Sequence, residues 1–143
     1  MTGGETGYGI WAFTIPQDLK RNISSKVIFM SMEKAIRNIN PIDAFNMMEE
    51  GEPLTIVDVR EPTEYRGDMG HIEGSLNIPL SELNRKLNEI ILPRDHPIAF
   101  ICATGERSLY ASKYAVELGF SNPMNIRGGI VQWHLSGLEV TYE

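Results

Sequence analysis

Apolar runs of strand length alternate with segments of helical periodicity along most of this sequence. The runs LTIVDV at 54–59 and IAFI at 98–101 are typical of strands that are buried on both faces. Two shorter runs, SLNIPL at 75–80 and MNI at 124–126, predict further strands, and KVIFM at 26–30 is a candidate for a brief one. The hydrophobic pattern therefore predicts several short strands spread along the chain.

The segments between these runs carry helix signals. Asn40 followed by Pro41 predicts the start of a helix, because Asn can cap the first turn and Pro suits its first position. Gly51 is expected to end that helix. Further along, Ser81 is expected to cap a helix that runs through Ile90, with leucines at helical spacing.

Two more helices are predicted in the second half of the chain. One starts near Arg107 or Ser108, soon after the IAFI run, and is closed by Gly119. The other follows a Gly-Gly pair and carries Trp133, which is expected to be a buried aromatic residue behind the preceding loop. Strands separated by helices predict an α/β fold with a central, mainly parallel sheet and helices on both faces.

Length and composition add a prediction about domains. The 143 residues, of which 42% are hydrophobic and 22% charged, suggest a single globular domain. Residues 1–33 do not share the alternating pattern, so we interpret them as an N-terminal extension or arm whose role the sequence does not assign. Residues 34–143 form the predicted domain.

Charge and cysteine content narrow the class of protein. The 13 basic and 19 acidic residues give a net charge of −6, which argues against a fold-wide nucleic-acid surface. No apolar run approaches the roughly 18 residues of a membrane span, so neither nucleic acid nor membrane is an expected partner. The single cysteine cannot form an internal disulfide and the first residues lack a secretory pattern, which together predict a cytoplasmic protein.

The segment that carries the chemistry is the loop CATGERS, which begins at Cys102. Cys102 stands at the carboxyl end of a predicted strand, where open parallel sheets bind ligands. Gly105 allows a tight turn, and the backbone N–H groups from Ala103 to Ser108 have no helical partner upstream, so they are available to an anion. Arg107 adds a positive charge. These features favour a thiolate, or a persulfide anion, on Cys102 over an inert buried thiol.

Four segments, in this order along the chain, resemble the motifs of rhodanese-like domains. They are TIVDVREPTEY at 55–65, GHIEGSLNIPL at 70–80, CATGERS at 102–108 and NIRGGIVQW at 125–133. The match spans roughly residues 35 to 138, and the four motifs together are much more specific than any one of them. The resemblance implies a rhodanese-like α/β fold and a sulfurtransferase in which Cys102 forms a persulfide.

The same resemblance implies a donor, an acceptor and a binding loop. Sulfane sulfur would pass from thiosulfate or a persulfide to cyanide or a thiol, and a protein sulfur acceptor is among the expected partners. The loop residues expected to bind the substrate are Ala103, Thr104, Gly105, Glu106, Arg107 and Ser108. Many catalytic members carry a basic residue at the position of Ala103, and Glu106 places a negative charge beside the anion site. Both departures predict slow turnover with dianionic thiosulfate.

Three further charged or polar residues are candidates for a role near the site. Asp58 and Arg60 follow the strand at 54–59, on the same side of the sheet as Cys102, and are candidates for a supporting role. A structural ion pair or a turn brace is the simpler interpretation of these two residues. His71 is expected to bind backbone and fix a turn, rather than to act as a base. The histidines and the cysteine lack metal-ligand spacing, so no metal is expected. No cofactor is expected either.

Two other functions stay open. A cysteine phosphatase or arsenate reductase also uses a cysteine in a loop of amides, but those families place five residues between cysteine and arginine. Four residues lie between Cys102 and Arg107. A non-catalytic binding or redox-sensing module would need only the fold, and the retention of Cys102, Gly105 and Arg107 together argues against it. The sequence does not assign the physiological donor, the acceptor or the oligomeric state.

Overall fold

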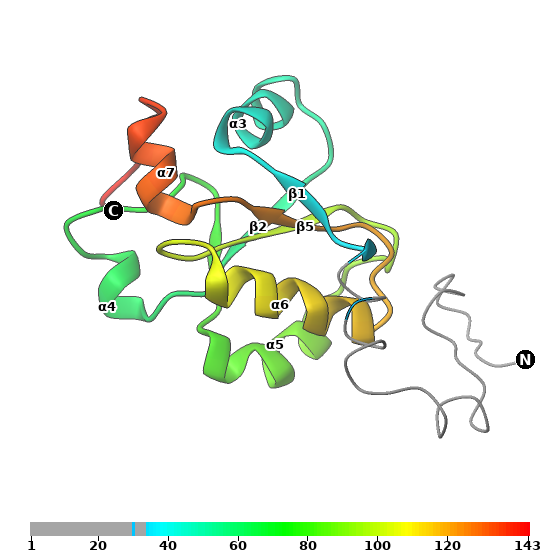
Figure 1. Ribbon diagram of the computed structural model, residues 1–143. Coiled ribbons are helices and arrows are strands. Elements are labelled where there is room, and N and C mark those ends of the chain that lie inside the picture. Colours follow the sequence, from blue (N-terminus) through cyan, green and yellow to red (C-terminus); the bar gives the residue numbers. More distant parts are fainter. Residues whose placement is uncertain (1–29, 31–33) are drawn as a thin grey trace, which may run out of the picture.

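The computed structural model describes Met30 and residues 34–143, which form one parallel sheet with helices packed on it (Figure 1). The strands are β1 (Arg37–Ile39), β2 (Thr55–Asp58), β3 (Leu76–Asn77), β4 (Ile98–Ile101) and β5 (Pro123–Ile126). The helices are α3 (Pro41–Glu49), α4 (Pro62–Tyr65), η2 (Leu80–Glu82), α5 (Leu83–Glu89), α6 (Glu106–Glu117) and α7 (Gly129–Leu135). Helices and strands alternate, as the hydrophobic pattern predicts.

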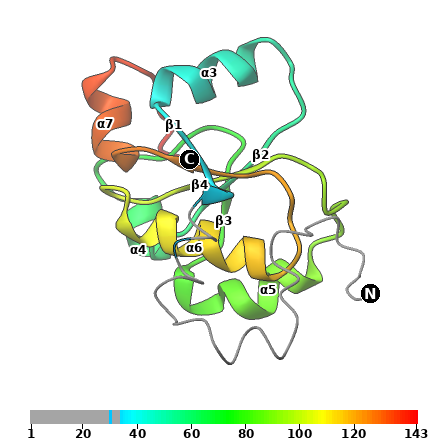
Figure 2. The ribbon, with the colours of Figure 1, turned by 45° about the vertical axis from the view of Figure 1, so that its right-hand side comes forward.

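The sheet has the strand order β1-β5-β4-β2-β3, and each neighbouring pair is parallel. Helices α3 and α7 lie on one face, whereas α5 and α6 lie on the other (Figures 1 and 2). Because the strands are parallel, their carboxyl ends meet at one edge, and the loops that enter α4, α6 and α7 all leave from that edge. The predicted α/β fold is confirmed.

Two apolar clusters fill the space between the sheet and its helices. Beneath α5 and α6, Leu87 and Ala111 pack with Phe100 of the central strand β4. Beneath α3 and α7, Ala44 and Trp133 pack with residues of the opposite sheet face. The central strands β2 and β4 have apolar residues on both faces because both faces are covered, which explains their uninterrupted apolar sequences.

Helix α3 begins and ends as its sequence predicts. The Asn40 side chain accepts a hydrogen bond from the backbone N–H of Asp43 at 3.0 Å, and Pro41 occupies the first turn. Gly51 follows the helix with a φ of 72°, in the left-handed region that glycine enters readily. Gly119 has the same role after α6, with a φ of 101°.

Several local predictions differ from the structure. Ser81 does not cap α5, because it lies inside the 3-10 turn η2, and α5 begins only at Leu83 without a side-chain cap. Helix α6 begins at Glu106, one or two residues earlier than expected. The candidate strand at 26–30 lies outside the described residues except for Met30, which is helical. The division at residue 33 stays a prediction.

Two elements carried too little signal to be predicted. Strand β1 has only three residues, two of which are exposed at the edge of the sheet, so it lacks an apolar run. Helix α4 has four residues, too few for a helical period. In the part of the chain that the structure describes, no helix is long and apolar enough to cross a lipid bilayer.

Candidate active site

Cys102 lies one residue beyond the end of β4, where the chain turns into the loop before α6. The loop folds back so that the backbone N–H of Gly105 donates a hydrogen bond to the Cys102 Sγ at 3.0 Å. Gly105 adopts a φ of 114°, which side chains rarely allow, so this close approach depends on glycine. The side chain of Cys102 is only 1% exposed. The sulfur therefore sits at the bottom of a loop made of main chain.

The first turn of α7 binds two carbonyls of the loop. The N–H of Ile130 donates to the Cys102 carbonyl at 2.8 Å, and the N–H of Val131 donates to the Ala103 carbonyl at 3.1 Å. A Cβ added to Gly129 would lie 2.4 Å from both of these carbonyl oxygens. The absence of a side chain at Gly129 thus lets α7 approach the active-site loop, a role that its sequence motif did not reveal.

The loop also has backbone N–H donors that are unused within the described residues. The N–H groups of Ala103, Thr104, Arg107 and Ser108 have no hydrogen-bond acceptor within the described residues. Together with the N-terminus of α6, they form the set of donors that the sequence predicts for an anion. These donors are available to an anion held in the loop.

Ser108 lies in the first turn of α6, fully buried beneath the sulfur. Its Oγ is 3.3 Å from the Cys102 Sγ and 2.6 Å from the Oδ1 of Asn125 on β5. The sequence placed Ser108 in the loop and Asn125 at the start of the closing motif, but it gave no sign that the two are in contact, because a hydrogen bond across 17 residues leaves no local pattern.

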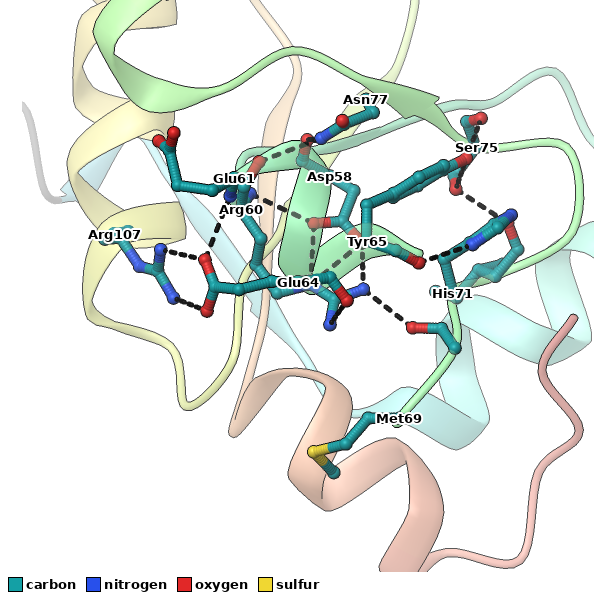
Figure 3. Close-up of polar contacts among 12 residues, drawn as sticks. Asp58, Arg60, Glu61, Glu64, Tyr65, Met69, His71, Ser75, Asn77 and Arg107 are labelled. Atoms are coloured by element: carbon teal, nitrogen blue, oxygen red, sulfur yellow. Dashed lines mark hydrogen bonds and ion pairs between the residues drawn. The ribbon is translucent and has the colours of Figure 1, made fainter. Parts of the chain in front are cut away.

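Arg107 points toward α4, where it meets Glu64 (Figure 3). Its two terminal nitrogens donate to the two oxygens of Glu64 at 2.8 and 3.0 Å, in a bidentate ion pair. This contact with Arg107 lowers the pKa of Glu64 to about 2, and it raises the pKa of Arg107. Since Glu64 balances its charge, Arg107 does not act as the isolated positive charge that the loop sequence suggested.

Glu106 lies at the rim of the loop and is exposed. Its carboxylate accepts a hydrogen bond from the Thr104 hydroxyl, and this contact, together with its own backbone N–H, lowers the pKa of Glu106. The carboxylate is therefore a fixed negative charge at the entrance to the loop.

Asp58 and Arg60 form a buried ion pair beside the loop (Figure 3). The Arg60 Nη2 lies 2.8 Å from an Asp58 oxygen, and the same guanidinium donates to the carbonyls of Glu64 and Gly70 at 3.2 and 2.8 Å. No hydrogen bond or ion pair joins either residue to Cys102 among the residues that the structure describes. The pair holds the α4 segment against β2, and a supporting role in catalysis stays a prediction.

His71 and Trp133 take the places expected of them. The His71 Nδ1 is 2.8 Å from the Tyr65 carbonyl oxygen, and its ring stacks on the Tyr65 ring with centroids 3.7 Å apart. Trp133 is 1% exposed, and its indole N–H donates to the Glu139 carbonyl. The prediction that His71 binds backbone is confirmed. Among the described residues, no cluster of three or more histidine, cysteine or acidic side chains is arranged to hold a metal ion.

Comparison with known proteins identifies relatives for most of this chain. Residues 41–136 match the family model described as a rhodanese-like domain. A sulfurtransferase of Allochromatium vinosum is 30% identical over 105 residues, which cover 71% of this chain and 94% of that protein. A crystal structure of a rhodanese-related protein from Thermoplasma volcanium superposes with a TM-score of 0.65 at 39% identity, covering 75% of this chain and 99% of the other.

A larger relative contains a segment like this one. The "probable adenylyltransferase/sulfurtransferase MoeZ" of Mycobacterium tuberculosis is 36% identical over 95 residues. That match covers 66% of this chain but only 24% of the relative. The similarity thus concerns one part of that protein.

Proposed function

Because this chain belongs to the rhodanese-like domain family, we propose that it is a sulfurtransferase that carries sulfane sulfur as a persulfide on Cys102. The observation that supports this most is the placement of the Cys102 Sγ, which accepts the Gly105 N–H inside a loop with four unused N–H donors. Such a loop stabilises a negative charge on Sγ, and equally on a sulfur atom bonded to it.

The first step loads the enzyme. The Cys102 thiolate attacks the outer sulfur of a donor, such as a persulfide R–S–SH or thiosulfate. A new Sγ–S bond forms while the donor's own S–S bond breaks, and its electron pair leaves with R–S⁻ or sulfite. The unused N–H groups of Ala103, Thr104, Arg107 and Ser108 are then available to the outer sulfur.

The second step transfers the outer sulfur from Cys102 to an acceptor. A thiol or cyanide acceptor attacks the outer sulfur, the Sγ–S bond breaks, and its electron pair returns to Cys102 as the thiolate. No net oxidation or reduction occurs and no cofactor is needed. A thiol-bearing protein is one proposed acceptor, and a small thiol is another.

The charges at the entrance favour donors of low negative charge. Glu64 balances Arg107, and Glu106 adds a fixed negative charge at the rim. We therefore propose that a neutral or singly charged persulfide reaches Cys102 more readily than dianionic thiosulfate does.

The phosphatase alternative is less well supported. A cysteine phosphatase has to grip two oxygens of a phosphoryl group with its arginine. In this chain the loop between Cys102 and Arg107 has four residues, one fewer than in those families, and Arg107 binds Glu64 with both terminal nitrogens. The loop suits one additional sulfur atom better than a phosphorus with its oxygens.

The test is intact mass spectrometry of the protein before and after treatment with a sulfane-sulfur donor. We expect the mass to rise by one sulfur atom, and to return when cyanide or a thiol is added. Cys102→Ser should show no such gain and no transfer, because the chain has no other cysteine. Sulfur transfer by Cys102→Ser would refute the covalent mechanism. An unmodified protein that never gains sulfur would instead favour the binding or redox-sensing module.

A further inference from the structure

A chain of polar side chains runs from the active-site sulfur through the protein interior. The Cys102 Sγ is 3.3 Å from the Ser108 Oγ, which is 2.6 Å from the Asn125 Oδ1. The Asn125 Nδ2 donates in turn to the Oδ1 of Asn38 on the edge strand β1, at 3.0 Å. Ser108 is 0% exposed and Asn125 is 4% exposed, so water has little access to either.

The Ser108 hydroxyl has one hydrogen and three acceptors within reach. These are the Cys102 Sγ, the Asn125 Oδ1 and the Gly105 carbonyl oxygen, which is 3.1 Å away. In the thiol form, the Cys102 S–H donates to the Ser108 Oγ, and the Ser108 hydroxyl is free to donate to Asn125. In the thiolate form, the sulfur has no hydrogen to donate and becomes the strongest acceptor of the three.

We propose that Ser108 is a positioning residue that stabilises the Cys102 thiolate by turning its hydroxyl hydrogen from Asn125 to Sγ. The thiol proton leaves to solvent, and no bond other than S–H is broken. The thiolate then accepts two hydrogen bonds, one from the Gly105 N–H and one from the Ser108 hydroxyl. This role rests on the proposed function, in which the thiolate of Cys102 is the nucleophile.

Asn125 has the opposite effect in this arrangement. Its Oδ1 competes with the sulfur for the same hydrogen, and it loses a hydrogen bond whenever Cys102 ionises. Removing Ser108 should therefore make ionisation harder, and removing the Asn125 oxygen should make it easier. A purely structural role for the two residues gives no reason for changes of opposite sign.

The experiment is a pH titration of the thiolate ultraviolet absorbance. The chain has one cysteine, so the signal belongs to Cys102, and Cys102→Ser supplies the tyrosine background. Ser108→Ala should raise the midpoint by about one pH unit, the size expected for one charge-assisted hydrogen bond. Ser108→Thr, which retains the hydroxyl, should restore most of the shift.

Ser112 offers a matched control one helical turn further along α6. It is also fully buried, and its hydroxyl binds the carbonyls of Ser108 and Met124 rather than the sulfur. Ser112→Ala should leave the midpoint within about 0.2 pH unit of the unmodified protein, well below one hydrogen bond. Equal shifts in Ser108→Ala and Ser112→Ala, or no shift in either, would overturn the proposal.

Asn125→Leu completes the test. It should lower the midpoint by a few tenths of a pH unit, and this effect should vanish when it is combined with Ser108→Ala, because it acts through the Ser108 hydroxyl. A rise in the midpoint, or an equal effect with and without Ser108, would contradict the competition. The titration requires no sulfur donor, so it can succeed even if persulfide formation fails, and it can fail while transfer persists.

Discussion

Arg60 and Arg107 both pair with an acidic residue near the active-site loop, but their surroundings differ. Arg60 and Asp58 are 2% and 0% exposed, and the Arg60 guanidinium also donates to two backbone carbonyls. Arg107 and Glu64 are 35% and 37% exposed and bind mainly each other. The first pair is part of the framework that holds α4 on the sheet, whereas the second lies where solvent can reach both side chains.

Burial determines what each pair can do. A buried charge that loses its partner cannot recover its hydration, so the Arg60–Asp58 pair has to stay closed in the folded protein. A half-exposed arginine can exchange one carboxylate for water or another anion at small cost. Arg60 therefore has a structural role, whereas the charge of Arg107 can be balanced by Glu64 or by another anion.

The largest expected effect comes from breaking the buried pair. Arg60→Ala would leave the Asp58 carboxylate buried without its cation and remove donors from the carbonyls of Glu64 and Gly70. We expect a loss of about 3–5 kcal/mol in the free energy of unfolding, measured by urea denaturation. Arg60→Lys, which keeps the charge but not the planar fork, should lose less. A loss below about 1 kcal/mol for Arg60→Ala, as for an exposed pair, would remove the distinction between the two arginines.

A smaller effect, on activity rather than on stability, is expected from opening the exposed pair. Glu64→Gln should free the charge of Arg107 and raise kcat/KM for thiosulfate by up to about tenfold, while a neutral persulfide donor is little affected. Arg107→Ala should lower kcat/KM for thiosulfate. A glutamine at position 64 can still accept the hydrogen bond from the Glu61 N–H. This bond is part of the capping box of α4, so the helix should persist.

Glu61 provides the control for that prediction. It belongs to the same segment and is exposed, but it has no contact with Arg107 among the described residues. Glu61→Gln removes the same unit of charge without opening the pair, so it should change thiosulfate turnover much less. Equal gains from the two variants would show that only the overall charge matters, and equal gains with both kinds of donor would contradict the electrostatic account.

The contrast between the two pairs also explains what the sequence could predict. The pairing of Arg60 with Asp58 was foreseen because the two residues are two positions apart at the end of a recognisable strand. The partner of Arg107 was not foreseen, because Glu64 is 43 residues away and belongs to a four-residue helix. Glu64 is part of the motif TIVDVREPTEY at 55–65, but a motif in the sequence does not show which basic side chain this carboxylate will bind.

The same limit applies to the rest of the site. Cys102, Gly105 and the donors of the loop follow from local geometry, since a strand, a glycine and a helix start lie within five residues. The roles of Asn125 and Gly129 depend on how β5 and α7 pack against that loop. The apolar strands β2 and β4 and the capped start of α3 were predictable. The short edge strand β1 was not, because two of its three residues are exposed and polar.

The smallest expected effect is a loss of stability in acid that depends on Glu64. Its pKa in the folded protein is about 2, compared with its usual value of 4.5, chiefly because of the hydrogen bond from Arg107. A lowered pKa means that the unfolded chain binds the proton first, so the stabilisation is complete above pH 4.5 and is lost as the pH falls toward 2. Because both side chains are more than a third exposed, solvent screening should limit this contribution to less than about 1 kcal/mol.

The measurement is urea denaturation of the unmodified protein and Glu64→Gln at neutral pH and near pH 3. The unmodified protein should lose more stability than the variant over this interval, and added salt should reduce the difference. If the two proteins lost the same amount, the Arg107–Glu64 pair would contribute nothing to folding, and its importance would lie in the electrostatics of the entrance alone.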